Sequence, residues 1–197
     1  MKKPKLYAIY HRHDDPAKNT IMKAARHGLV RIIHHPPPGA ITLTPYTVNV
    51  IAPTDRVIIE KRGVCVIDCS WRRRTPIQKA SRTPTARRLP ILYAGNPINY
   101  AKPYTLSSIE ALAATLYITG YTETAEQLLS LYKWGHTFKQ LNQHLLQAYQ
   151  EAKTRQEILQ IECNEIKRVT GTQIQCTPEK LATIATKTIE HETGKPT

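Results

Sequence analysis

Short runs of branched, aromatic and other apolar side chains recur five times in the first hundred residues and do not recur after them. Runs of this kind, bounded by glycine, proline or polar turn residues, are typical of buried β-strands. We expect strands at residues 5–10, 29–33, 40–43, 64–67 and 89–94. Several connections between them are long, which favours parallel pairing, because parallel strands need a long crossover connection whereas antiparallel strands can be joined by short turns. The first half therefore predicts an α/β fold with a parallel sheet.

Helical signals accompany and then replace the strands. Within the first half, residues 20–27 and 55–62 each carry helical character and are each followed by glycine, a common helix terminator. After residue 100 only helical periodicity remains, and Ser107 with Glu110 forms a capping box for the first of these helices. Further helices are expected after Thr122, around Phe138 to Tyr149, from Thr154 to Val169, and from Thr177 onward. We predict an α/β domain over residues 1–100 and a helical domain over residues 101–197.

The positive charge of the chain is concentrated in its first half. Residues 1–105 hold 19 lysines and arginines against 5 acidic residues, whereas residues 106–197 hold 9 against 10. Clustered lysine and arginine side chains attract phosphates through counterion release. We therefore expect an RNA-binding surface on the first half. A basic surface that serves only solubility is the alternative.

Other features narrow the class of protein. The sequence has no apolar run long enough to span a bilayer and no signal-peptide pattern at its start, which predicts a soluble, cytoplasmic protein without a membrane partner. None of the four cysteines forms a Cys-x-x-Cys pair, so we expect no metal site. Cys65 and Cys69 are expected to be buried and reduced, and Cys163 and Cys176 could meet between adjacent helices.

Polar and acidic residues follow two of the predicted strands. Asp68-Cys-Ser-Trp71 comes after the fourth strand and Gly95-Asn-Pro97 after the fifth, with arginines clustered between them. Ligands bind at the carboxyl ends of parallel strands, so we expect the active site here. A carboxylate after an apolar strand must find a hydrogen-bond partner or face a ligand; capping the next turn is the alternative for Asp68. Trp71 offers a flat face for a base or a sulfonium, with core packing as its alternative.

Several motifs in this region are specific enough to indicate a family. They are Asp68-Cys-Ser-Trp71, Arg-Leu-Pro-x-Leu at residues 88–92, Ala94-Gly-Asn-Pro-Ile-Asn-Tyr100, Lys102-Pro103, Leu106-Ser107 with Glu110-Ala111, and Lys133-Trp134-Gly135 with Phe138 and Asn142. Upstream, Asp15-Pro16, Thr20 and Leu43-Thr-Pro45 extend the pattern. Over about residues 5–150 the chain resembles the small-subunit rRNA aminocarboxypropyltransferases of archaeal and eukaryotic ribosome biogenesis. Gly95 and Ala101 depart from that family's usual Ala and Gly, and Ala101 removes a flexible turn position.

The resemblance implies both a fold and a reaction. The fold would be a SPOUT-like, five-stranded parallel sheet with a deep trefoil knot around S-adenosylmethionine, followed by an all-helical C-terminal domain. The reaction would transfer the 3-amino-3-carboxypropyl group to N3 of a (methyl)pseudouridine in small-subunit rRNA and release 5'-methylthioadenosine. The partners would be rRNA or its precursor and S-adenosylmethionine, and the protein would act as a monomer.

The resemblance also assigns residues to roles. Asp68 would orient the cofactor's ammonium or accept the N3 proton, and both roles remain open. The cofactor-binding set is Thr20, Leu43, Cys69, Ser70, Trp71, Leu92, Ala94, Leu106, Ser107 and Ala111. The RNA-binding set is Lys18, Lys23, Arg73, Arg74 and Arg88. A SPOUT RNA methyltransferase and a non-catalytic RNA-binding assembly factor are the alternative functions.

Overall fold

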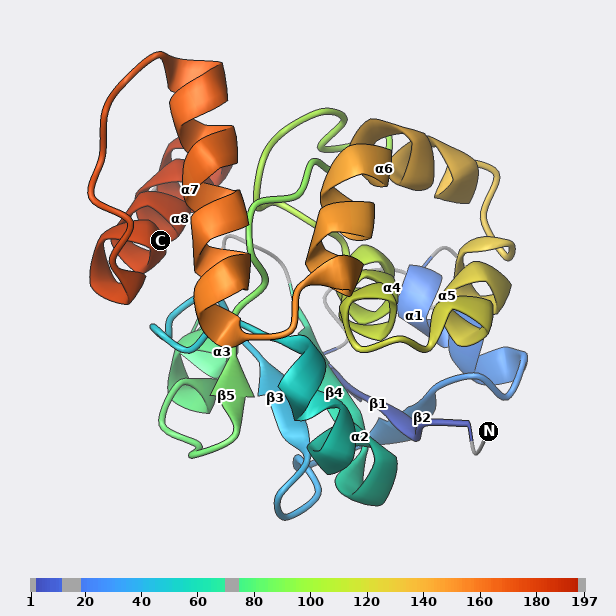
Figure 1. Ribbon diagram of the computed structural model, residues 1–197. Helices are drawn as coiled ribbons and strands as arrows, with labels where there is room; N and C mark the ends of the chain where they lie inside the picture. Colours follow the sequence, from blue (N-terminus) through green and yellow to red (C-terminus); the bar gives the residue numbers. More distant parts are fainter. Residues whose placement is uncertain (1–2, 12–18, 70–74, 195–197) are drawn as a thin grey trace.

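The protein is built on a five-stranded parallel sheet, seen in a computed structural model that describes residues 3–11, 19–69 and 75–194 (Figure 1). The sheet has the order β2-β1-β4-β3-β5, and every pairing between neighbours is parallel. Its strands are β1 (Leu6–Tyr10), β2 (Arg31–Ile33), β3 (Ile41–Leu43), β4 (Val64–Asp68) and β5 (Ala86–Arg87). The central strand β4 is buried up to Ile67, and its last residue, Asp68, reaches the edge of the sheet. The predicted parallel α/β class is confirmed.

The fifth strand differs from its prediction. It occupies Ala86–Arg87, whereas residues 89–94 leave the sheet and contain only an isolated bridge from Tyr93 to Pro103. Pro90 lacks a backbone N–H and cannot continue a ladder of hydrogen bonds. The apolar character of residues 89–94 has a different cause: this segment enters the core beside the helices.

Four helical segments of the first half connect the strands. They are α1 (Thr20–Arg26), the 3₁₀ turn η1 (Pro53–Asp55), α2 (Arg56–Arg62) and α3 (Thr75–Ala80). Asn19 caps α1, its side chain accepting a hydrogen bond from the Met22 backbone. After α2 the chain turns at Gly63 with φ of 85°. A Cβ at this position would lie 2.4 Å from the Lys5 carbonyl oxygen, so glycine allows α2 to lead directly into β4.

The second half of the chain is helical in the described residues. Its helices are α4 (Ser108–Ile118), α5 (Thr122–Leu129), α6 (Gly135–Glu151), α7 (Arg155–Thr170) and α8 (Pro178–Thr193). The predicted capping box of Ser107 and Glu110 is present, and the side chains of Thr154 and Thr177 cap α7 and α8. Figure 1 shows α7 and α8 side by side on one flank, with α4, α5 and α6 grouped on the other.

One hydrophobic cluster joins the two halves. It runs from Leu6 in β1 to Ile189 in α8, and α4 packs against β4, α1, α5 and α6. The sheet and the helices of the second half therefore share one large core, which holds α4 beside the carboxyl end of β4, and a smaller cluster packs Ile77 and Ala80 of α3 against Ile67. In the part of the chain that the structure describes, none of the helices has the length and apolar character needed to cross a membrane.

A disulfide joins the last two helices. Cys163 in α7 bonds to Cys176, which immediately precedes the Thr177 cap of α8, and their Cα atoms lie 5.4 Å apart. The sequence had indicated that these two cysteines could meet between adjacent helices. The bond closes the connection between α7 and α8, and so restrains α8 against α7.

Replacing Cys176 with alanine is expected to lower the free energy of unfolding by about 3 kcal/mol, the chain-entropy value for a loop of this length. The sequence separation of the two cysteines is 13. Urea unfolding with and without dithiothreitol measures the effect. Reduction should bring the wild type to the stability of the variant and leave the variant unchanged. Equal stability of the oxidised wild type and the variant would contradict the prediction.

Candidate active site

A cavity of about 730 Å³ lies at the carboxyl ends of β3 and β4. Its walls come from these strand ends, the start of α4, residues 96–99, Trp134 before α6, and the last turns of α8. Pockets for cofactors and other small molecules commonly measure about 300–1,000 Å³. The cavity thus has the size of a nucleotide-like ligand and occupies the place where parallel sheets bind such ligands.

Asp68 dominates one end of the cavity. Its Oδ1 atom accepts a hydrogen bond of 2.5 Å from the Ser108 hydroxyl, and its Oδ2 atom accepts one of 2.9 Å from the Asn19 amide. Ser108 is the first residue of α4 and Asn19 is the cap of α1. The carboxylate is therefore held in one orientation by two helix starts, while its half-buried position leaves it open to the cavity.

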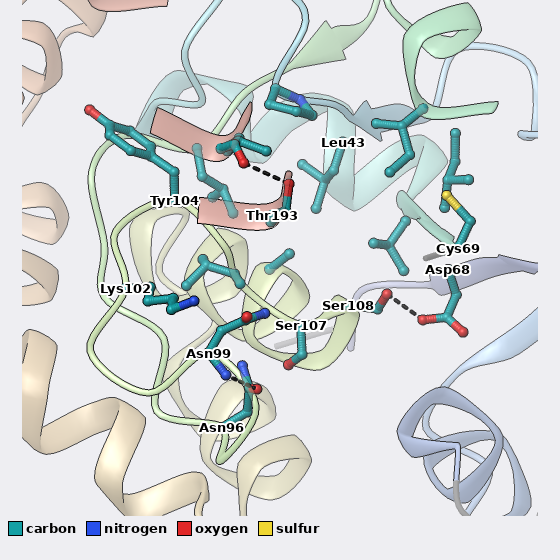
Figure 2. Close-up of a pocket in the computed structure, with 18 of the residues that line it drawn as sticks. Leu43, Asp68, Cys69, Asn96, Asn99, Lys102, Tyr104, Ser107, Ser108 and Thr193 are labelled. Atoms are coloured by element: carbon teal, nitrogen blue, oxygen red, sulfur yellow. Dashed lines mark hydrogen bonds between the residues drawn. The ribbon is translucent and has the colours of Figure 1, made fainter. Parts of the chain in front are cut away.

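The opposite end of the cavity is also polar. Figure 2 shows Lys102, Asn99 and Asn96 on the side away from Asp68, with Ser107 between the two groups. The Lys102 ammonium lies 3.4 Å from a carboxylate oxygen of Glu192 near the end of α8. Between the polar ends, the walls are mainly apolar and include Leu43, Leu106 and Ala111. Such an arrangement suits an elongated ligand with polar ends and a flat apolar middle.

Glu110 holds two walls of the cavity together. This side chain is fully buried, and its carboxylate accepts hydrogen bonds from the Gly95 and Asn96 backbones, the Asn96 amide and the Ser107 backbone. The four donors satisfy the buried charge. Glu110 thereby joins the start of α4 to residues 95–96, so that both present a defined surface to the ligand.

Cys69 follows Asp68 and also lines the cavity. Burial, helped by the neighbouring Asp68 charge, raises the pKa of the Cys69 thiol to about 12. The thiol is therefore protonated at neutral pH and is a poor nucleophile. Cys69 serves as a small wall residue, consistent with the packing role expected from the sequence.

Most of the described residues predicted to bind the cofactor come together at this cavity. Those that line it are Thr20, Leu43, Cys69, Leu106, Ser107 and Ala111, together with Asp68. Leu92 and Ala94 do not line it. Both are fully buried in the segment that precedes residues 96–99. The Leu92 carbonyl accepts a hydrogen bond from the Tyr104 backbone N–H, and the Ala94 carbonyl accepts one from the Ala101 backbone N–H. They support the wall from the core side.

Arg88 was predicted to contact RNA phosphates, and this prediction is wrong. The side chain is 1% exposed, and its two terminal nitrogens each donate a 2.8 Å hydrogen bond to the Glu162 carboxylate of α7. Burial alone would lower the pKa of Arg88, but the Glu162 charge raises it. The Tyr104 hydroxyl donates to the same carboxylate. The guanidinium thus joins the sheet edge to α7 and is unavailable to RNA.

The other predicted RNA contacts are only partly described. Lys23 is half-buried; its ammonium donates a hydrogen bond to the Leu131 carbonyl and lies 5.3 Å from the centre of the Tyr132 ring. It therefore anchors α1 to the turn before α6. Lys18, Arg73 and Arg74, together with the cofactor residues Ser70 and Trp71, lie outside the described residues.

Several residues of the site were not singled out from the sequence. Asn19 and Ser108 fix Asp68, and Ala185, Ile189, Glu192 and Thr193 of α8 form part of the cavity wall. The helix-start positions of Asn19 and Ser108 were a usable signal, because each of these helices is the next one after a predicted strand. No local pattern indicated that α8 returns to the cavity, since α8 lies far along the chain from β3, β4 and residues 96–99.

Ala101, which departs from the glycine usual in the resembling family, adopts φ of 60° in an exposed turn beside the cavity. A left-handed conformation costs a residue with a Cβ about 1–2 kcal/mol. We expect Ala101→Gly to raise the free energy of unfolding by about 1 kcal/mol, measured by urea unfolding. The matched control Ala148→Gly, inside α6, should lower it by about 1 kcal/mol. A destabilised Ala101→Gly protein would contradict the expectation.

The fold and the cavity together define an α/β protein with a cavity of nucleotide size at the carboxyl edge of a parallel sheet. Comparison with known proteins identifies the family. The family model described as "Ribosome biogenesis protein, C-terminal" matches residues 41–166. The chain belongs to the 16S rRNA aminocarboxypropyltransferase family, as its curated relatives establish.

Two such relatives illustrate the similarity. The 16S rRNA aminocarboxypropyltransferase of Vulcanisaeta distributa is 46% identical over 151 residues, covering 74% of this chain and 82% of the relative. That of Thermoplasma acidophilum is 46% identical over 150 residues, covering 75% and 90%. The solved structure of the SAM-dependent rRNA:acp-transferase Tsr3 from Vulcanisaeta distributa superimposes with a TM-score of 0.73 at 37% identity. The superposition covers 93% of this chain and 98% of the solved chain.

Proposed function

We propose that this protein transfers the 3-amino-3-carboxypropyl group of S-adenosylmethionine to N3 of a (methyl)pseudouridine in small-subunit rRNA, releasing 5'-methylthioadenosine. The observation that carries the proposal is the cavity at the strand ends, with Asp68 fixed by Asn19 and Ser108, in a chain of this family. The basic first half provides the charge for an RNA partner.

The residues of the cavity fit S-adenosylmethionine. The donor has an amino-acid arm at one end, which carries an ammonium and a carboxylate, and an adenosine at the other, with the cationic sulfonium between them. The Asp68 carboxylate supplies an acceptor for the ammonium, and the apolar side chains of Leu43, Leu106 and Ala111 supply surfaces for a flat base. Lys102, Asn96 and Asn99 offer polar groups at the far end. When bound, the sulfonium supplies an electrophilic carbon, activated by the thioether leaving group.

We assign Asp68 to orientation. Both of its oxygens accept hydrogen bonds from Asn19 and Ser108, so the carboxylate is preorganised, and each oxygen can accept one further bond. Holding the amino-acid arm determines which carbon next to the sulfonium faces RNA. Alignment of reactants in this way can supply about 7–11 kcal/mol of a barrier reduction.

A labelling experiment tests the proposal. Carboxyl-labelled and, separately, methyl-labelled S-adenosylmethionine are incubated with the protein and an unmodified rRNA hairpin. Carboxyl label on the RNA, together with released methylthioadenosine, is expected. Methyl label alone would favour a SPOUT methyltransferase. Absence of S-adenosylmethionine binding in calorimetry would favour a non-catalytic RNA-binding assembly factor.

Finer features of the protein belong to the same proposal. A trefoil knot around the cofactor is supported by the resemblance to the family. A division near residue 100 is supported by the change from strands to helices. A monomer acting in the cytoplasm is consistent with an rRNA substrate. Contacts from Lys18, Arg73 and Arg74 to the RNA backbone are supported by the charge of their half.

A further inference from the structure

Two aromatic side chains lie between α5 and α6 and form a stacked pair. The rings of Tyr132 and Trp134 have centroids 5.0 Å apart and an interplanar angle of 27°. Tyr132 is held in place, because its hydroxyl donates a 2.6 Å hydrogen bond to the Thr20 carbonyl and the Lys23 ammonium lies over its ring. Tyr132 thus provides a fixed support for one face of the Trp134 indole.

Trp134 is linked to the Asp68 end of the cavity through its stacked partner, Tyr132. Trp134 lines the cavity and is half-buried. Its support, Tyr132, binds Thr20, and Thr20 follows Asn19, whose amide binds Asp68 at 2.9 Å. The indole therefore belongs to the same corner as the carboxylate that orients the amino-acid arm. Within residues 3–11, 19–69 and 75–194, the indole N–H has no hydrogen-bond partner.

The reaction requires a nucleobase in this corner. The pyrimidine N3 must come within bonding distance of the carbon carried by the amino-acid arm, and the base must be held with its edge toward that carbon. Proteins hold unstacked RNA bases by placing them against aromatic side chains. An enzyme that modifies a base in a structured RNA also needs a surface that replaces the lost stacking.

We infer that Trp134 stacks on the acceptor nucleobase, supported from behind by Tyr132, and presents its N3 edge to the cofactor beside Asp68. The inference rests on the proposed function. It assigns Trp134 to RNA and not to the cofactor, which is the alternative for an aromatic side chain in this cavity. The uracil-type ring has a π-face but little charge, so recognition depends on the aromatic character of residue 134.

Two variants separate these roles. Trp134→Leu removes the aromatic face, whereas Trp134→Phe keeps it. Loss of one base-stacking contact, about 1–3 kcal/mol, corresponds to roughly a 5- to 150-fold fall in kcat/KM for the rRNA hairpin in Trp134→Leu. Trp134→Phe should stay within about fivefold of the wild type, because an aromatic face remains. Calorimetry with S-adenosylmethionine should give a Kd within about twofold of the wild type for both variants, the expectation when no cofactor contact is lost.

Fluorescence provides a direct readout. The chain has two tryptophans, so Trp71→Phe leaves Trp134 as the only one. Its emission should be quenched by the rRNA hairpin and not by the same hairpin with an abasic acceptor site. This measurement needs no catalysis, and it also covers the case in which Trp134→Leu fails to fold.

Equal quenching by both hairpins, or a fall in S-adenosylmethionine affinity as large as the fall in kcat/KM, would overturn the inference. Unchanged kcat/KM in a folded Trp134→Leu protein would overturn it as well. Failure of the proposed function is a different result, because the wild type itself would then transfer no carboxyl label to the hairpin.

Discussion

Replacing Arg88 with methionine is expected to lower the free energy of unfolding by about 3–5 kcal/mol, the usual cost of breaking a buried ion pair. Among the residues that the structure describes, the substitution leaves the Glu162 carboxylate in the core with only the Tyr104 hydroxyl as a partner. Methionine has a similar length and no charge, so the effect reports the lost pairing more than lost volume. Urea unfolding followed by circular dichroism measures the change.

Two further variants make this test specific. Lys139→Met breaks the exposed pair with Glu126, whose side chains are 50% and 43% exposed, and should cost less than about 1 kcal/mol. Replacing both Arg88 and Glu162 with methionine should recover most of the loss, because two apolar side chains leave no unpaired charge. A double variant that is less stable than Arg88→Met alone would show that the pair is not the source of the effect.

Replacing Asp68 with asparagine is expected to weaken S-adenosylmethionine binding by about 10- to 100-fold, since a hydrogen bond to a charged group contributes about 1.5–3 kcal/mol. Transfer to RNA should fall by at least about 100-fold, because small errors in the placement of reacting atoms are costly. Asparagine preserves the shape of the side chain and removes its charge. Calorimetry and carboxyl-label transfer measure the two effects.

Methylthioadenosine distinguishes the roles considered for Asp68. This product lacks the amino-acid arm, so its affinity should be the same for the wild type and Asp68→Asn if the carboxylate binds the ammonium. Ser108→Ala, which removes one of the two donors to Asp68, should weaken S-adenosylmethionine binding by about tenfold or less, the value of one ordinary hydrogen bond. Retained S-adenosylmethionine affinity with abolished transfer in Asp68→Asn would indicate a general base.

Local sequence patterns predicted the secondary structure well where the cause was local. The capping box at Ser107 and Glu110 and the cap at Thr154 depend on side chains within a few residues of the helix start. The strand at residues 89–94 was the exception, because apolar composition does not distinguish a strand from a segment buried among helices. Pro90 was the signal against that strand.

The site was predictable in its position and less so in its contacts. The end of β4 was expected to carry the ligand site, and Asp68 lines the cavity there. Arg88 was assigned to RNA because arginines cluster around it in the sequence. The signal for its burial was Glu162, an acidic residue four positions from both Ile158 and Ile166 on the apolar side of α7. A carboxylate on such a face requires a buried cation.

The sequence alone determined the parallel α/β class, the helix caps and the edge of the sheet at which the cavity lies, because these follow from periodicity and from residues close together in the chain. The tertiary structure decided which side chains meet: Asp68 with Asn19 and Ser108, Arg88 with Glu162, and the end of α8 with the cavity. The first two sets join residues 40 to 74 positions apart. Such pairings depend on how helices and sheet pack together, and a local pattern can show that a buried group needs a partner but not which distant residue supplies it.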